Sequence, residues 1–242
     1  MNILSIGNSF SQDAHRYLHQ IARAGGVDLN VYNLYIGGCS LARHYRNMLG
    51  EGSDYVLEVN GNSTGFHVSL KQALLNRDWD VVTLQQVSHK APDYESYQPY
   101  LDKLVDYVRA CVPKAKIALH QTWAYEQGSR RLTEVAGYAD CRDMLRDIVA
   151  ANRTAAAHIG ADCVIPAGEL FGALQERGLE NLHRDTFHAS LGLGRYALGL
   201  LWYGVLTGNE VGGIDLCDLD EDVTPEQVAV ATKCVMALAG HE

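Results

Sequence analysis

The sequence predicts a single α/β domain, a three-layer α/β/α sandwich in which helices cover both faces of a five-stranded parallel sheet. Two observations support this fold class. Short apolar runs alternate with longer amphipathic segments along the chain, and such alternation is typical of parallel sheets. The 242 residues contain no internal repeat and no linker rich in Pro, Gly or Ser, so one domain over residues 1–242 is expected.

The elements follow from this alternation in chain order. Right-handed crossovers between the strands favour the flavodoxin-like strand order 2-1-3-4-5. Strands are predicted over 2–6, 28–35, 80–85, 116–121 and 162–165. Helices are predicted over 14–24, 41–49, 70–76, 97–111, 136–159, 168–177, 191–206 and 225–239.

One segment breaks the alternation. From Tyr55 to Ser69 apolar residues recur at every second position around Asn60-Gly61-Asn62, which is a strong β-hairpin signal. We expect a small β-hairpin excursion between the second and third strand–helix units. It is either one rim of a functional site or a simple surface hairpin.

Charge and hydropathy exclude some classes of protein. With 20 basic and 29 acidic residues the net charge is −9, which argues against a nucleic-acid partner and favours a neutral or cationic substrate. No apolar run of membrane-spanning length is present, and no basic and apolar leader precedes the first strand. A cytoplasmic location is expected, although a trimmed exported chain would look the same.

The cysteines are scattered and show neither a CxxC pair nor a short spacing to histidine. We interpret them as small buried residues in a reducing compartment, and no metal site is predicted. They are Cys39, Cys111, Cys141, Cys163, Cys217 and Cys234.

The turn Gly7-Asn8-Ser9 directly follows the first predicted strand. In a parallel sheet, ligands bind at the carboxyl ends of the strands, and Ser9 would lie where free N–H groups at a helix N-terminus can meet developing negative charge. Ser9 is therefore a candidate nucleophile, although a helix-capping serine is the commoner role. The nearby Asp13 is explained as an acidic residue that favours the helix dipole.

A nucleophilic serine needs a base, and the base needs an orienting carboxylate. Asp185 lies three residues before His188 near the far end of the chain, so a short irregular segment can join the two side chains. This spacing is common by chance, but together with Ser9 it predicts a Ser-His-Asp triad. His183 is interpreted as a loop histidine.

These motifs resemble those of the SGNH hydrolases, the GDSL esterases and lipases. The family places its catalytic serine in a Gly-Asp-Ser or Gly-Asn-Ser turn after the first strand and its acid and base in Asp-x-x-His, which match Gly7 to Ser9 and Asp185 to His188. Its second motif supplies a glycine N–H to the oxyanion hole. The resemblance assigns this role to Gly38, with Gly37 as the alternative register.

The third motif departs from the family pattern, which is usually Gly-x-Asn-Asp. Here Gln85, Gln86, Val87 and Ser88 follow the third predicted strand, and no asparagine is present. The Gln86 amide could supply the same N–H donor on a longer side chain, so the predicted oxyanion hole consists of Ser9, Gly38 and Gln86. Ser88 is the alternative.

The resemblance implies a serine esterase that needs no cofactor. We expect a short-chain acyl ester, with O-acetyl favoured, of a carbohydrate or another small polar alcohol, with Trp123 and Tyr125 as a platform for the sugar and Ser88 also at the substrate. Two alternatives stay open: a flavodoxin-like module that binds phosphate or a nucleotide at the Gly7–Ser11 turn, and a catalytically inactive relative.

Overall fold

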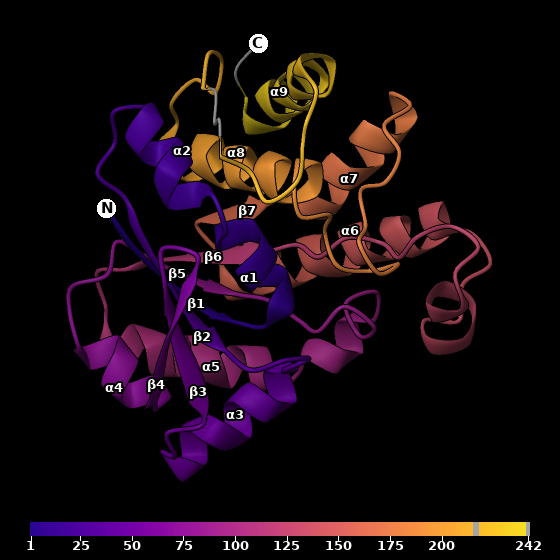
Figure 1. Ribbon diagram of the computed structural model, residues 1–242. Coiled ribbons are helices and arrows are strands. Elements are labelled where there is room, and N and C mark those ends of the chain that lie inside the picture. The colour runs from indigo at the N-terminus through magenta and orange to yellow at the C-terminus, as the bar shows by residue number, and fades with distance from the viewer. Residues whose placement is uncertain (215–217, 241–242) are drawn as a thin grey trace.

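A seven-stranded sheet organises the molecule (Figure 1). The computed structural model describes residues 1–214 and 218–240. Along the sheet the strands follow the order β4-β3-β2-β1-β5-β6-β7. They are β1 (Asn2–Gly7), β2 (Asn30–Tyr35), β3 (Tyr55–Val59), β4 (Asn62–Val68), β5 (Val81–Leu84), β6 (Lys116–His120) and β7 (Cys163–Ile165).

The prediction of a five-stranded sheet is wrong in strand count and in the full order. Five parallel strands lie as β2-β1-β5-β6-β7, and the predicted hairpin adds β3 and β4 at one edge as antiparallel strands. The hairpin is thus part of the sheet. The reason is that β2 has a free edge, and pairing with β3 satisfies its backbone groups.

The hairpin turn has the predicted chemistry. Asn60 and Gly61 have φ angles of 51° and 79°, as a tight two-residue hairpin turn requires. A Cβ on Gly61 would lie 2.6 Å from the Arg16 carbonyl oxygen, so the turn packs directly on the chain between the first two helices. The outermost strand, β4, is exposed along almost its whole length.

The helices match the predicted segments with some differences at their ends. The predicted helix 14–24 is divided at Arg16 and Tyr17, and the predicted helix 97–111 begins only after Pro99. The helices are α1 (Ser9–His15), α2 (Leu18–Ala24), α3 (Leu41–Gly50), α4 (Leu70–Leu75), α5 (Tyr100–Cys111), α6 (Cys141–Ile159), α7 (Ala167–Glu176), α8 (Leu193–Thr207) and α9 (Pro225–Ala239), with short helical turns η1 (Tyr94–Tyr97) and η2 (Arg131–Val135).

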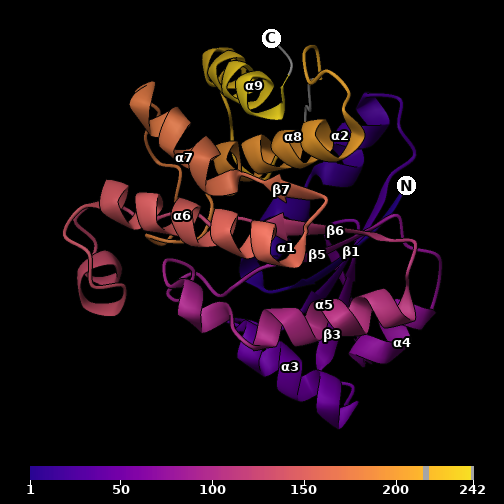
Figure 2. The same cartoon turned by 180° about the vertical axis from the view of Figure 1, so that it is seen from behind.

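Helices cover both faces of the sheet, as predicted (Figures 1 and 2). Helices α1, α2, α7, α8 and α9 share one hydrophobic core with the sheet, and α3, α4 and α5 share the other. Side chains alternate along β1, so Ile3 enters the first core and Leu4 the second. Helix α6 contributes to both cores, with Ile148 in the first and Ala155 in the second.

The carboxyl ends of the parallel strands define one edge of the molecule. The chain leaves β1 at Gly7, β2 at Tyr35, β5 at Leu84 and β6 at His120, and the predicted motifs follow at these points. The fold therefore brings together the four segments in which we expected functional residues. Within residues 1–214 and 218–240, none of the helices combines the length and the apolar character needed to span a bilayer.

Candidate active site

The turn between β1 and α1 exposes Ser9 at the start of the helix. Asn8 is the N-cap, with an extended backbone (φ −148°, ψ −153°), and its side-chain oxygen accepts a hydrogen bond of 3.0 Å from Phe10 N. Gly7 is required here, because a Cβ would lie 2.0 Å from Ser11 Oγ. As the first residue of α1, Ser9 keeps a backbone N–H that has no partner within the helix.

The structure brings Ser9, His188 and Asp185 together. His188 Nε2 lies 2.8 Å from Ser9 Oγ, and His188 Nδ1 lies 2.7 Å from Asp185 Oδ2. These are the distances of a serine activated by a histidine that a carboxylate orients. The His188 side chain is 16% exposed and that of Asp185 is 44% exposed, so the acid lies on the solvent side of the base.

The loop that carries the acid and the base folds back on itself. His188 N donates a 2.8 Å hydrogen bond to Asp185 Oδ1, and Thr186 between them has a positive φ of 73°. Partial burial would raise the pKa of Asp185, but the hydrogen bonds from the His188 side chain and backbone outweigh it and lower that pKa. The carboxylate is thus held ionised beside the imidazole.

Asp13 joins this loop to the helix of Ser9. Its carboxylate is completely buried and accepts hydrogen bonds from Arg184 Nη1 (2.8 and 3.0 Å), Arg195 Nε (2.9 Å) and Ala189 N (3.1 Å). The interpretation of Asp13 as an acid that favours the helix dipole is wrong, because the residue lies in the second turn of α1 and the first turn contains no acid. Its partners are too distant in sequence to give a local signal.

The second motif forms a tight turn beside the serine. Cys39 N donates to the Ile36 carbonyl at 3.1 Å, and Gly38 at the third position of this turn has φ 61°, which favours glycine. Gly37 and Gly38 both line the pocket at Ser9. No other described residue accepts a hydrogen bond from the Gly38 N–H, which leaves this donor available to a ligand.

The structure does not bring the Gln86 amide to Ser9. Gln86 Nε2 donates to the carbonyl and to the hydroxyl of Ser96 at 2.8 and 3.1 Å, while its oxygen accepts from Leu41 N and Val87 N. Both N–H bonds are therefore used to fix the surrounding loops. The alternative residue, Ser88, does line the pocket, and its hydroxyl lies 2.8 Å from that of Tyr125.

Sequence reasoning missed the role of Gln85. Its Nε2 donates a 2.6 Å hydrogen bond to Asn8 Oδ1, and its Oε1 lies 2.8 Å from His120 Nδ1. Asn8 Nδ2 in turn donates to the Cys39 carbonyl at 3.0 Å. One buried chain of hydrogen bonds thus connects the ends of β5 and β6 with both turns beside Ser9.

The pocket over Ser9 has a volume of about 320 Å³ and contains aromatic, polar and basic groups. Tyr125 lines it, but Trp123 does not: the indole is fully buried, packs on Phe10 and Phe171, and donates to the Phe187 carbonyl at 2.8 Å. The expectation that Trp123 forms a sugar platform is therefore wrong. The pocket is lined by Asn8, Ser9, Phe10, Tyr35, Gly37, Gly38, Val87, Ser88, His89, Tyr125, Arg131, Phe187 and His188.

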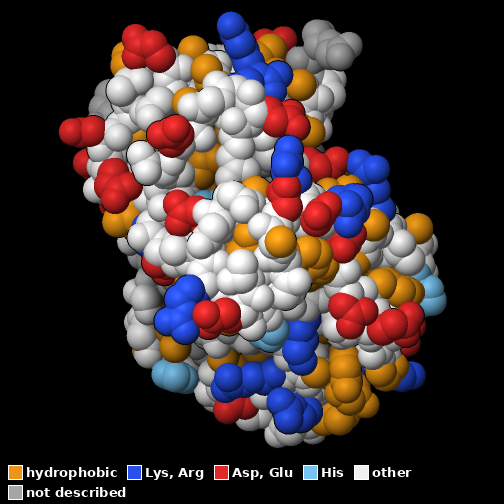
Figure 3. All heavy atoms as spheres, turned by 90° about the vertical axis from the view of Figure 1, so that its right-hand side faces the viewer, with side chains coloured by type: hydrophobic (Ala, Val, Ile, Leu, Met, Phe, Trp, Pro, Cys, Tyr) orange, Lys and Arg blue, Asp and Glu red, His pale blue; other side chains and the backbone are white. Residues whose placement is uncertain are grey.

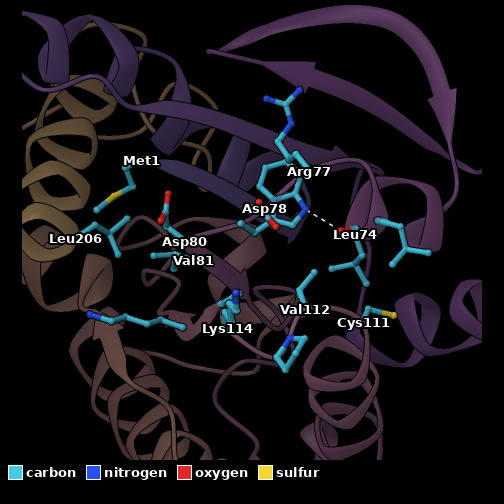
Figure 4. A pocket seen from close by; sticks show the side chains of 15 residues that line it. Met1, Leu74, Arg77, Asp78, Asp80, Val81, Cys111, Val112, Lys114 and Leu206 are labelled. Carbon is cyan, nitrogen blue, oxygen red and sulfur yellow. Dashed lines mark hydrogen bonds between the residues drawn. The ribbon is translucent and has the colours of Figure 1, made fainter.

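A larger hollow of about 810 Å³ lies at the other end of the strands, and neither Ser9, Asp185 nor His188 lines it. Figure 4 shows Met1 and Leu206 on one side of it and Cys111 and Val112 on the other. Asp80 and Val81 at the beginning of β5 lie between them. This hollow opens at the amino ends of the strands, away from the site described here.

The described residues contain no cluster of His, Cys, Asp and Glu side chains that could hold a metal ion. His183 is a half-buried loop residue whose ring lies 3.1 Å from the Ala124 carbonyl, and loss of hydration lowers its pKa to about 4. Cys39, Cys111, Cys141, Cys163 and Cys234 are free thiols, whereas Cys217 lies outside the described residues.

Comparisons with solved structures agree with this architecture. A proposed SGNH hydrolase from Slackia heliotrinireducens is 24% identical, with a TM-score of 0.61 over 84% of this chain and 97% of that one. A proposed GDSL-like lipase from Parabacteroides merdae is 14% identical, with a TM-score of 0.56 over 88% and 96%. At these identities the likeness shows a shared SGNH-like fold. No curated protein matches the sequence.

A much stronger likeness links the chain to one family. A DUF4886 family protein from Bacteroides uniformis is 30% identical, with a TM-score of 0.89 over 100% of this chain and 96% of that one. The family model described as a domain of unknown function, DUF4886, matches residues 2–236. The chain is therefore a member of the DUF4886 family and has the SGNH-like fold.

Proposed function

We propose that this protein is a serine esterase that hydrolyses short-chain acyl esters, such as O-acetyl esters, of small polar alcohols or carbohydrates. The observation that carries the proposal is the continuous hydrogen-bonded series from Ser9 Oγ through His188 to Asp185. The SGNH-like fold supports it, because two structures that share the fold are described as a proposed hydrolase of that group and a proposed lipase. Fold alone would not suffice.

The chemistry follows from the positions of the side chains. Ser9 Oγ attacks the ester carbonyl while His188 Nε2 accepts its proton, and the imidazolium then protonates the leaving alcohol as the bond between the carbonyl carbon and the alkoxy oxygen breaks. Water, deprotonated by His188, attacks the acyl-enzyme and releases the acid. Asp185 keeps the imidazole in the required orientation and stabilises its charged form.

The developing oxyanion needs hydrogen-bond donors. The Ser9 and Gly38 N–H groups are available at the pocket, and we assign the third donor to the Ser88 hydroxyl instead of the Gln86 amide. In this arrangement the Tyr125 hydroxyl donates to Ser88 Oγ, so that the hydroxyl proton of Ser88 points into the pocket. The modest volume of about 320 Å³ favours a small acyl group.

The test compares hydrolysis of p-nitrophenyl acetate and longer-chain p-nitrophenyl esters by wild type, Ser9→Ala and His188→Ala. We expect kcat to fall by at least about 10³ in both variants, because each removes a member of the triad. Covalent labelling by a fluorophosphonate in wild type and its loss in Ser9→Ala would identify the nucleophile. Equal rates in all three proteins together with no labelling would contradict the proposal.

A further inference from the structure

The pocket over Ser9 contains an arginine without an acidic partner. Arg131 at the start of η2 lines the pocket, and none of the pocket-lining residues is Asp or Glu. The adjacent Arg130 differs, because its guanidinium pairs with Glu134 at 2.9 Å. Within residues 1–214 and 218–240, no ion pair neutralises Arg131. A guanidinium in this state is a ready partner for an anion.

Contacts with aromatic side chains hold Arg131 at the pocket. Its guanidinium carbon lies 3.7 Å from the centre of the Phe187 ring, and the Phe187 and His188 rings are themselves 3.7 Å apart. The guanidinium and the imidazole thus both lie against the Phe187 ring. Stacking restricts the arginine, and one of its N–H groups is shared with the Tyr125 hydroxyl, which leaves most of its five N–H donors for a ligand.

His89 extends the same wall. It lines the pocket, and partial desolvation together with the nearby charges of Lys90 and Arg131 lowers its pKa, which favours the neutral ring. A neutral imidazole offers one N–H donor and no competing charge. The wall therefore combines a cation and neutral donors in a protein whose overall net charge is −9.

Figure 3 shows the side of the molecule toward which the carboxyl ends of the parallel strands and η2 point. Lys and Arg side chains are interspersed there with Asp and Glu side chains. On this side an anionic ligand would therefore depend on a local group and not on a large basic field. This local arrangement differs from the expectation, drawn from the net charge, of a neutral or cationic substrate.

We infer that Arg131 forms an anion subsite for the alcohol part of the substrate, so that the preferred ester carries a carboxylate or a comparable anionic group on its leaving alcohol. The inference rests on the proposed esterase function. His188 protonates the leaving oxygen, so the alcohol must lie on the imidazole side of Ser9, which is the side where Phe187 and Arg131 lie. The anion contacts a part of the substrate that does not react.

The test uses two acetate esters of similar shape, 4-acetoxybenzoate and the neutral 4-acetoxybenzamide, with wild type, Arg131→Gln and the matched control Arg130→Gln. We expect Arg131→Gln to raise KM for the anionic ester about tenfold with little change in kcat, because a contact made equally in ground and transition states affects binding. For the amide, KM and kcat should each change by less than about twofold. Arg130→Gln should leave both esters unchanged, and Arg131→Lys should restore part of the loss.

Salt gives an independent measurement, because Arg131 is exposed and screening weakens an exposed pair. In wild type, 0.5 M NaCl should raise KM for 4-acetoxybenzoate and leave the KM of the amide unchanged. Equal effects of Arg131→Gln on the two esters would overturn the subsite. The subsite would also be overturned if Arg131→Gln selectively lost activity on mono-4-nitrophenyl succinate, because the anion of that ester is on the acyl side.

Binding of the product alcohols separates the subsite from the esterase. Calorimetric titration should show 4-hydroxybenzoate binding more tightly than 4-hydroxybenzamide to wild type, with this preference lost in Arg131→Gln. Suppose that wild type hydrolyses 4-acetoxybenzamide, but neither hydrolyses 4-acetoxybenzoate faster nor binds 4-hydroxybenzoate more tightly than the neutral counterparts. In that case only the subsite is wrong. If hydrolysis of both esters survives in Ser9→Ala, the esterase proposal fails whatever the binding result.

Discussion

The buried Asp13 carboxylate and the Arg184 guanidinium form an ion pair, with oxygen to nitrogen distances of 2.8 and 3.0 Å, between the helix that begins at Ser9 and the loop that ends at His188. Arg184 Nη1 also donates to the Ala189 carbonyl at 2.5 Å. The pair therefore helps to fix the distance between Ser9 and His188, although it forms no hydrogen bond with either side chain.

Replacement of Asp13 should affect both stability and activity. Asp13→Asn leaves Arg184 and Arg195 without their buried counter-charge, so we expect the free energy of unfolding to fall by about 3–5 kcal/mol and kcat to fall as the loop shifts. Urea unfolding and kcat on p-nitrophenyl acetate measure the two effects. The control is Asp220→Asn. The Asp220 carboxylate is partly exposed and pairs with Arg16 and Arg195, so its loss should lower the free energy of unfolding by about 1 kcal/mol or less. Equal losses in both variants would contradict the role given to Asp13.

The two candidates for the third oxyanion donor predict different kinetics. Ser88→Ala should lower kcat about 10²-fold, because it removes a donor that acts on the oxyanion, whereas KM should change little. Gln86→Ala should lower the melting temperature, because its amide links Leu41, Val87 and Ser96, and should lower kcat far less. A larger kcat loss in Gln86→Ala than in Ser88→Ala would return the role to the glutamine.

Gln85 should act as a positioning residue. Gln85→Leu removes the 2.6 Å hydrogen bond to Asn8 and leaves the His120 ring without its partner, so we expect about 1–3 kcal/mol lower stability and roughly tenfold lower kcat. Gln85→Glu keeps an acceptor for His120 but cannot donate to Asn8 when ionised. If the turn depends on this donor, activity in Gln85→Glu should recover as the pH falls, while wild type shows no such recovery.

Three buried histidines should make the fold sensitive to acid. Burial lowers the pKa of His15, His44 and His120 to about 3, and no described group bonds the Nε2 atoms of His44 and His120. The unfolded chain binds protons near the ordinary pKa of 6.5, so their contribution to stability is complete above that pH and is lost as the pH falls toward 3. Urea unfolding should show that the free energy of unfolding decreases by up to about 4 kcal/mol for each unit by which the pH falls within this window.

His44 provides the control for the acid effect, because it stacks on Tyr55 away from the pocket. His44→Gln should reduce the slope by up to about 1.4 kcal/mol per pH unit without altering the pH dependence of ester hydrolysis. An unchanged slope would mean that this ring is not kept neutral by the fold.

Much of the architecture follows from local sequence pattern. Apolar runs identified the five parallel strands, and Asn60-Gly61 identified the hairpin, because these signals depend on neighbouring residues. The pairing of β3 with β2 is a contact between separate segments, so the seven-stranded sheet could not be read from the hairpin alone. The break between α1 and α2 has no glycine or proline to mark it, whereas Pro99 was an available signal for the late start of α5.

The candidate site was predictable to a similar extent. The motifs located Ser9, Asp185, His188 and Gly38, since each follows a strand or carries its own spacing. The direction of the Gln86 amide depends on Ser96, and the burial of Trp123 depends on Phe10 and Phe171, so neither was visible in the sequence. Asp13 and its arginine partners are separated by 171 and 182 positions, which hides their relationship entirely.

The hydrogen bond between Ser9 and His188 joins residues that are 179 positions apart. During synthesis on the ribosome, Ser9 emerges just after the first strand, while His188 follows only after every strand of the sheet has been made. Through most of its translation, a nascent chain therefore contains Ser9 without its hydrogen-bond partner His188. Recovery of ester hydrolysis after dilution from denaturant should accordingly require the docking of the His188 loop against Ser9.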